Sequence, residues 1–373
     1  MLLLACCLVG HVRVLPWSIP LDDISDRDGL AKLDGIARDP SPRAALGWFI
    51  GDDPQGVHTF RPVPAVTLWI EWLLWGHARW PYLAVNLIYL YLTALALLVV
   101  ARRLGFTERF GWVGAAILLL RPTRGSIGVT AGIATRHDLL CTLFAMLAVV
   151  ALLDWLRQGR RPAMAAYLAW SLLAYLSKEM ALALIPLSAA IAWVECRRLA
   201  LPRRLWVGVA ASLGVGLVWL VWYRLAEQNM GHVPHQSHSL GGMIGMLFTR
   251  NPDMHLQAMT YNLGWWLADV LRQFKAVPIT LLVFSQIFWK SLLRAVISVS
   301  CFVWLWRHRR YAVLLIYLWK LITYLPVMPL HDTWPWYEYM PHVLDPLLYA
   351  AAFWLAAEQL SQRRAARMSG EQT

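Results

Sequence analysis

The sequence predicts an all-α, polytopic membrane protein with about ten transmembrane helices. Three observations predict this fold class. Of the 373 residues 59% are hydrophobic, apolar runs of membrane-spanning length recur along the chain, and the basic residues gather in short clusters between those runs. A formal charge of +12 could also indicate nucleic-acid binding. Because the clusters follow the rule that cytoplasmic loops are rich in lysine and arginine, we exclude nucleic acid as a partner.

The predicted spans alternate in direction, and every connection expected on the cytoplasmic side contains a basic cluster. The spans cover residues 1–19, 82–100, 110–120, 138–155, 163–176, 180–194, 205–223, 288–306, 311–327 and 340–357. Both termini would then be cytoplasmic. A transmembrane domain would occupy residues 1–360, and a basic cytoplasmic tail would occupy residues 361–373.

Individual residue types add further expectations. The five cysteines show no C-x-x-C spacing and mostly lie in apolar runs, so neither a disulfide framework nor a zinc site is indicated. Three histidines at 232, 235 and 238 could bind a divalent ion, but Pro234 between them favours an ordinary loop. Arginine exceeds lysine and alanine is abundant, which indicates a GC-rich bacterial source and hence the inner (plasma) membrane.

Two outer loops and two surface helices complete the predicted topology. The first loop, 20–61, has more acidic than basic residues and a helical patch near 44–50. The second, 224–277, contains an amphipathic patch at 261–274. Residues 61–79 begin with two prolines and are rich in tryptophan, which is typical of a helix at the membrane surface. These tryptophans are better explained as an interfacial anchor than as a platform for a sugar.

An acidic pair, Asp22-Asp23, directly follows the first apolar segment. Two adjacent carboxylates at the mouth of a span cost free energy, which favours a role in chemistry or ion binding. The competing interpretation is a solvated turn that caps a helix, and local sequence does not decide between the two.

The predicted topology brings the unusual polar residues to one face of the membrane. Cations and carboxylates gathered there, beside broken and surface helices, suit a site that binds an anionic headgroup and performs acid or base chemistry. These residues are Asp22, Asp23, Arg61, Arg121, Arg124, Arg136, His137, Asp138, Lys178, Glu179, Arg224, Asp332 and Glu338.

Short motifs in a fixed order carry a family resemblance. After the acidic pair come Phe60-Arg61-Pro62, an aromatic helix ending Leu74-Trp75-Gly76, Asn86, Arg136-His137-Asp138-Leu139-Leu140, Leu176-Ser177-Lys178-Glu179 and Tyr337-Glu338-Tyr339-Met340-Pro341. In this order, over nearly the whole chain, they resemble the membrane part of the GT-C glycosyltransferases. More narrowly, they resemble the protein O-mannosyltransferases that carry tetratricopeptide repeats, and their bacterial relatives. Each motif alone would recur by chance.

The resemblance implies an enzyme that moves a sugar from a polyprenyl-phosphate carrier to a hydroxyl of a glycan, lipid or protein on the outer face. Asp22 or Asp23 would act as the general base, and the configuration would invert. The leaving phosphate needs fixed positive charge, for which the candidates are Arg61, Arg136, Lys178 and Arg224, with the intramembrane Lys320 behind them. Further site candidates are Asp138, Glu179, Glu338 and His137. A divalent cation is compatible with the resemblance, but no metal ligands are assigned.

The chain departs from the family pattern at two places. Arg121-Pro122 stands where the family usually has His-Pro, so contacts attributed to that histidine do not carry over. No repeat-containing segment follows the last span in this sequence.

Several alternatives remain open. Arg136 and Asp138 could be a local ion pair at a helix start, Lys178 and Glu179 could lie in a solvated turn, and Glu338 could be an acceptor contact or a polar cap. A transporter or flippase of lipid-linked sugars would also gather charge near broken helices, but no internal repeat supports it. The third alternative is a catalytically silent relative.

Overall fold

The computed structural model describes residues 2–11, 24–54, 59–120, 132–230, 311–324 and 339–368, with a few single residues at 130 and between 300 and 307. The regular structure in these ranges is helical, which confirms the all-α class. The helices are α1 (Leu2–His11), α2 (Ile24–Arg38), α3 (Pro42–Gly47), α4 (Pro62–Trp75), α5 (Arg79–Arg103), α6 (Glu108–Leu120), α8 (Arg136–Gln158), α9 (Arg161–Tyr175), the 3-10 helix η2 (Glu179–Ala183), α10 (Leu184–Leu199), α11 (Pro202–Asn229), the helix Tyr311–Tyr324, α15 (Tyr339–His342) and α16 (Asp345–Met368).

Four helical segments in the described residues are long and apolar enough to cross a membrane: α5, α8, η2 continued by α10, and α11. They contain four of the predicted spans and support a membrane protein. The predicted spans 110–120 and 163–176 correspond to the shorter helices α6 and α9, and 340–357 lies largely within α16. Of the predicted spans 1–19 and 311–327 the structure describes residues 2–11 and 311–324, which are helical. Most of span 288–306 lies outside the described residues, so the count of about ten remains a prediction.

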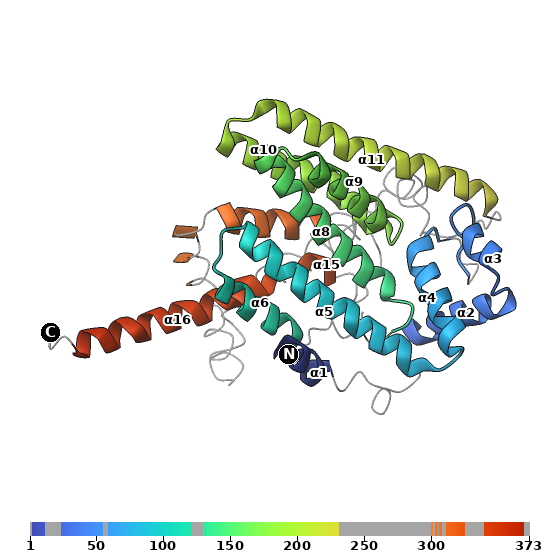
Figure 1. Ribbon diagram of the computed structural model, residues 1–373, viewed down its shortest axis with the longest axis horizontal. Coiled ribbons are helices and arrows are strands. Elements are labelled where there is room, and N and C mark those ends of the chain that lie inside the picture. The colour runs from blue at the N-terminus through green and yellow to red at the C-terminus, as the bar shows by residue number, and fades with distance from the viewer. Residues whose placement is uncertain are drawn as a thin grey trace, which may run out of the picture.

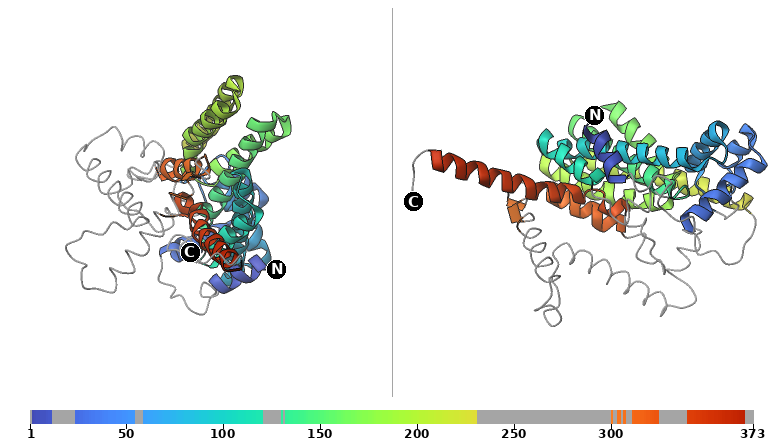
Figure 2. Two further views of the ribbon diagram at one scale, coloured as in Figure 1. Left: turned by 90° about the vertical axis from the view of Figure 1, so that its left-hand side faces the viewer. Right: turned by 90° about the horizontal axis from the view of Figure 1, so that it is seen from below.

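Helix α8 is the centre of the bundle. It lies between α5 and α6 on one side and α9, α10 and α11 on the other (Figure 1). In its apolar window 78% of the residues are buried, against 22% for α11, so α8 is enclosed by protein while α11 is peripheral. Helix α16 extends away from the bundle on the side opposite to α2, α3 and α4 (Figures 1 and 2). The predicted boundary at residue 360 falls inside α16, which continues to Met368 without interruption.

Helices α2, α3 and α4 together form a unit that we call the cap. A second, smaller hydrophobic core lies beneath these helices. It is formed by Leu33, Ile36, Ala45, Trp48, Ala65, Leu68, Tyr82, Leu83 and Ile133. Helix α3 overlaps the helical patch predicted near 44–50, and α4 lies in the predicted aromatic helix. Helix α2 is a correction, because its residues lie in the segment predicted to be an acidic outer loop. Burial of its apolar side chains against α4 and α5 stabilises the helix.

The basic clusters after α5, α8 and α10 lie together at one end of the bundle, which we call the basic end. Arg103 donates to both oxygens of Asp154, at 2.5 and 2.9 Å. Arg157 contacts Glu195 through Nε at 2.8 Å and donates to the Arg103 carbonyl at 2.7 Å. Basic clusters that are separated by apolar spans in the sequence are therefore neighbours in space.

Glu195 has a fully buried side chain that accepts hydrogen bonds from Arg157, Arg198 and Tyr311. We expect Glu195→Gln to lower the free energy of unfolding by about 3 kcal/mol, because it leaves buried donors around an uncharged group. Unfolding by SDS titration in mixed micelles would measure this. Glu108→Gln is the matched control, since its pair with Arg102 is exposed and should change little. Equal effects of the two substitutions would contradict the role assigned to Glu195.

Candidate functional site

Five ionisable residues gather where α4, α8 and η2 begin, and we call them the charged cluster. Arg61 is the N-cap residue of α4, His137 and Asp138 lie in the first turn of α8, and Lys178 and Glu179 lie at the start of η2. The residues come from three segments far apart in the sequence. All five are among the residues predicted from the sequence to form the site.

The first pair in the charged cluster joins Arg61 to Glu179. The Arg61 guanidinium donates through Nε to Oε2 at 3.1 Å and through Nη2 to Oε1 at 2.7 Å. Its third nitrogen, Nη1, lies 3.5 Å from Nε2 of His137. This bidentate geometry is the one that arginine offers to a phosphate. In this structure a carboxylate of the protein occupies it.

The second pair joins Lys178 to Asp138. The Lys178 ammonium donates to Oδ1 of Asp138 at 2.5 Å, and Nε2 of His137 lies 3.0 Å from Oδ2. Both partners of the lysine–aspartate pair have almost no exposed side-chain surface. The two positive charges of Arg61 and Lys178 equal in number the two negative charges of Asp138 and Glu179. Such pairing is the condition for burying charged groups away from water. An added anion would therefore have to compete with Glu179 or Asp138 for a cation.

Local backbone structure explains why Arg61 faces Glu179. Pro62 takes the first position of α4, where no N–H is needed. The Val63 N–H donates to the Leu176 carbonyl at 3.3 Å, which ties the start of α4 to the end of α9. Lys178 follows with extended backbone, at φ −164° and ψ 143°, and this turns the chain from α9 into η2. The turn thus presents Lys178 and Glu179 to the starts of α8 and α4.

Arg136 belongs to a separate buried network. Its guanidinium donates to Glu71 at 2.5 Å, to Asn86 at 2.9 Å and to the Tyr82 carbonyl at 2.9 Å, and it has no exposed surface. Burial raises the pKa of Glu71, an effect that Arg136 opposes. These contacts join α8 to α4 and α5, which favours a positioning role for Arg136. Its assignment to donor phosphate remains a prediction.

The two local alternatives for these charges are wrong. Arg136 pairs with Glu71 in α4 and not with Asp138 in its own helix turn. Lys178 does not lie in a solvated turn, because its side chain is fully buried against Asp138. Both charges are held by partners that lie far away in the sequence.

Helix α2 docks onto the segment that leads into α8. A Cβ atom at Gly29 would lie 2.6 Å from Cβ of Ile133 and 3.1 Å from the backbone nitrogen of Ala134, so only glycine permits this approach. Leu33 and Ile36 of α2 share the small core of the cap with Ile133. Asp22 and Asp23 themselves lie outside the described residues, but α2 begins directly after them at Ile24.

A buried ion pair also ties α2 to the chain ahead of Arg61. The Lys32 ammonium donates to Asp53 at 2.7 Å, and the Thr59 hydroxyl donates to the same carboxylate oxygen at 3.0 Å. Burial raises the pKa of Asp53. The charge and hydrogen bond of Lys32, the hydrogen bond of Thr59 and the charge of Arg61 outweigh burial and hold that pKa below its usual range.

The remaining predicted site residues lie elsewhere. Arg224 has an exposed side chain and pairs with Glu227 in its own helix at 2.7 Å. Lys320, in the helix Tyr311–Tyr324, is buried with Asp345 at 3.3 Å, and Nδ1 of His342 lies 2.6 Å from the same carboxylate oxygen. Glu338, the histidines of 232–238 and the segment 121–125 lie outside the described residues, as do Asp22 and Asp23.

Four residues that matter for the site were not identified from the sequence. Glu71 carried a signal, since it is the one acidic residue in a strongly apolar helix. Gly29, Lys32 and Asp53 carried none, because a glycine and two charges in an acidic segment are typical of a loop. Their importance follows from contacts with residues far away in the sequence.

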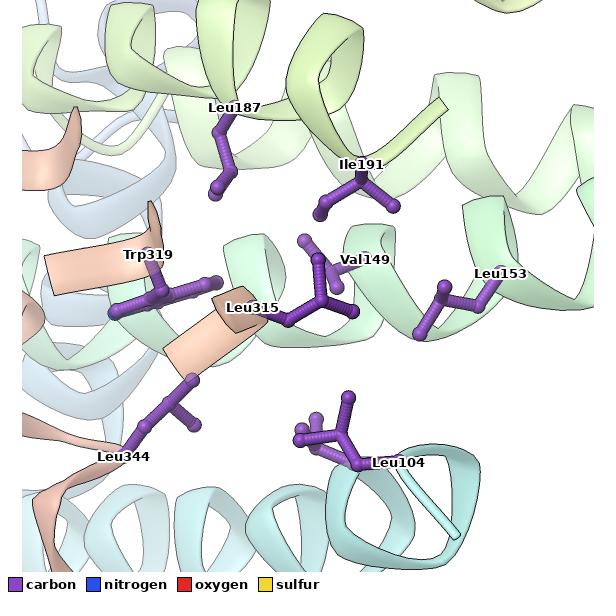
Figure 3. A pocket seen from close by; sticks show the side chains of 9 residues that line it. Leu104, Val149, Leu153, Leu187, Ile191, Leu315, Trp319 and Leu344 are labelled. Atoms are coloured by element: carbon purple, nitrogen blue, oxygen red, sulfur yellow. The ribbon is translucent and has the colours of Figure 1, made fainter. Parts of the chain in front are cut away.

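A pocket near the basic end does not belong to the charged cluster. Figure 3 shows that its side chains come from α5, α8, α10, the helix Tyr311–Tyr324 and Leu344. All of them are apolar, and Leu104 and Leu153 directly adjoin Arg103 and Asp154 in the sequence. Among the described residues, no three His, Cys, Asp or Glu side chains gather as metal ligands.

Comparison of the chain with protein-family models, curated proteins and solved structures finds no match. The resemblance to the GT-C glycosyltransferases therefore depends on the order of the motifs and on the chemistry of the residues that form them.

The docking of α2 should depend on pH through Asp53. Because its folded-state pKa is lowered, this carboxylate adds stability above its unfolded pKa of about 3.9, and that stability is lost as the pH falls below it. Hydrogen exchange of the α2 amides, corrected for intrinsic rates, should show protection at pH 7 that falls below about pH 4. Asp53→Asn should weaken protection at pH 7 and remove this dependence. Asp34→Asn, on the exposed face of α2, is the control, and a loss as large as that of Asp53→Asn would contradict the assignment.

Proposed function

We propose that the protein is a membrane glycosyltransferase that moves a sugar from a polyprenyl-phosphate donor to an acceptor hydroxyl. The acceptor is a hydroxyl of a glycan, lipid or protein. By the rule that arginine-rich loops stay in the cytoplasm, the basic end faces inward and the charged cluster faces the outer side of a bacterial inner membrane. Donor and acceptor would then meet outside the cytoplasm.

The observation that supports this proposal most is the docking of α2 beside the charged cluster. Gly29 packs on Ile133 and Ala134, which lie four and three residues before His137. Helix α2 begins one residue after Asp23. The acidic pair is therefore tethered to a helix that is fixed at the start of α8, where cations for a leaving phosphate are available.

In the proposed reaction, the carboxylate of Asp22 or Asp23 accepts the proton of the acceptor hydroxyl. The hydroxyl oxygen forms a bond to the anomeric carbon from the face opposite the phosphate, which inverts the configuration. The bond between that carbon and the phosphate oxygen breaks, and the phosphate leaves with the electron pair. A fixed cation stabilises the negative charge that develops on it.

Arg61 and Lys178 are the proposed source of that positive charge. Arg61 is the less buried of the two, and its bidentate geometry fits two phosphate oxygens. Glu179 would hold the guanidinium in position until the phosphate replaces it, and Asp138 would keep Lys178 charged in a buried site. The whole cluster thus serves as a preorganised anion site.

A specific observation favours a second candidate function, the transport of lipid-linked sugars. Lys320, His342 and Asp345 form a buried charged group within the helical bundle, and intramembrane charges often mark substrate or ion pathways. A transporter would depend on this group and not on Asp22 or Asp23.

Replacement of the acidic pair tests the transferase proposal. We expect Asp22→Asn or Asp23→Asn to lower transfer by about a hundredfold or more, because the variant lacks the base. Mass spectrometry of glycans and glycoproteins from cells that lack the gene and carry each variant would measure this. Asp26→Asn is the matched control, with the same change within the same acidic segment. Full transfer by the Asp22→Asn/Asp23→Asn double variant would refute the assignment.

Lipid-linked sugar flipping in proteoliposomes separates the two functions. The transferase proposal predicts that the wild type, Lys320→Met and the Asp22→Asn/Asp23→Asn double variant all flip the lipid no faster than empty liposomes. Flipping by the wild type that is lost in Lys320→Met and retained in the Asp22→Asn/Asp23→Asn double variant would instead identify a transporter.

A further inference from the structure

We propose that the basic end carries a binding site for the headgroup of an anionic phospholipid, formed by Arg160, Arg161, Arg197 and Arg203. These four residues, which we call the arginine corner, lie at the junction of α8 with α9, where Arg160 and Arg161 begin α9, and at the junction of α10 with α11, where Arg197 is in the last turn of α10 and Arg203 in the first turn of α11. The proposal does not depend on the glycosyltransferase activity.

The four residues of the arginine corner have no counterions among the described residues, unlike most of the other arginines at the basic end. Arg102 pairs with Glu108, Arg103 pairs with Asp154, and Glu195 accepts from Arg157 and Arg198. Within the part of the chain that the structure describes, no carboxylate pairs with any residue of the arginine corner. Glu108, Asp154 and Glu195 are thus paired with other arginines. Four exposed positive charges remain for a ligand outside the protein.

The two junctions that carry the arginine corner lie side by side. Arg204, next to Arg203, donates to the Leu156 carbonyl near the end of α8 at 2.7 Å. A Cβ atom at Gly159 would lie 2.7 Å from the guanidinium of Arg204, so the backbone ahead of Arg160 packs directly on that side chain. The first turns of α9 and α11 contain no acidic residue, so no side chain of these turns offsets the positive ends of the two helices.

Exposed tryptophans beside the arginine corner indicate the level of a membrane interface. Trp193 is 48% exposed, and the Arg197 guanidinium lies 4.3 Å from the centre of its ring. Trp206 is 71% exposed in the first turns of α11. Tryptophan is enriched where headgroups meet acyl chains, and arginine there directs its charge to the headgroups.

An apolar surface continues from the arginine corner along α11. Val207, Leu213, Leu217, Val218, Val221 and Leu225 are all more than half exposed. A free phosphate would use only the charges, whereas a phospholipid would also place its acyl chains against this surface. One guanidinium group can bind two phosphate oxygens at once. Basic clusters at the ends of membrane helices also attract anionic lipids. Charge and apolar surface together therefore select an anionic phospholipid.

Native mass spectrometry of the full-length protein, delipidated in detergent, tests the proposal. We expect phosphatidylglycerol to bind about tenfold or more tightly than phosphatidylcholine with the same acyl chains. Replacing all four arginines with glutamine should abolish the preference, and replacing them with lysine should retain much of it, because the charge remains. Circular dichroism would verify that the helices persist. If the fourfold variant does not fold, the double variants Arg160→Gln/Arg161→Gln and Arg197→Gln/Arg203→Gln serve the same test.

Arg109→Gln is the matched control, since Arg109 is exposed near the same end but lies on α6, away from α9 and α11. It should retain the preference for phosphatidylglycerol. An unchanged preference in the glutamine variants, or an equal loss in Arg109→Gln, would overturn the proposal. Inorganic phosphate at millimolar concentration should not displace the lipid. Displacement by phosphate would overturn the lipid assignment and identify a site for a soluble anion.

Discussion

The pairing of buried charges is the constraint on which the rest of this structure depends. A cation or carboxylate enclosed in an apolar bundle is tolerated only beside an opposite charge. Lys178 meets Asp138 and Arg61 meets Glu179, although 40 and 118 positions separate the partners along the chain. These pairs tie α4, α8 and η2 together at one end of the bundle. The apolar packing of α8 against its neighbours brings the partners within reach.

The same constraint explains the cap. Arg136 has no exposed surface, and its buried charge needs hydrogen-bond acceptors. These are Glu71 of α4, and Asn86 and the Tyr82 carbonyl of α5. The Lys32–Asp53 pair then fastens α2 above the same region. Charge pairing thus joins the cap to the bundle, while Gly29 permits the close contact. Helix α2, which follows the acidic pair in the sequence, is thereby attached at the start of α8.

The two ends of the bundle use charge in different ways. In the charged cluster the cations are buried and matched by carboxylates, which suits a preorganised site that admits an anion only by exchange. At the basic end several arginines are paired, but the arginine corner is exposed and has no carboxylate partner among the described residues. Exposed charge beside exposed tryptophan suits the surface of a membrane. The proposed reaction and the proposed lipid site therefore belong to opposite ends.

The sequence by itself determined the all-α membrane class, because long apolar runs and basic clusters are local patterns that need no knowledge of the fold. It also identified Arg61, His137, Asp138, Lys178 and Glu179 as candidates, and α4 by its paired prolines. Only the tertiary structure decided their partners, separated Arg136 from the charged cluster, and revealed α2 as a docked helix. The physical reason is that an ion pair or a glycine contact depends on distance in space, and the partners here lie tens of residues apart.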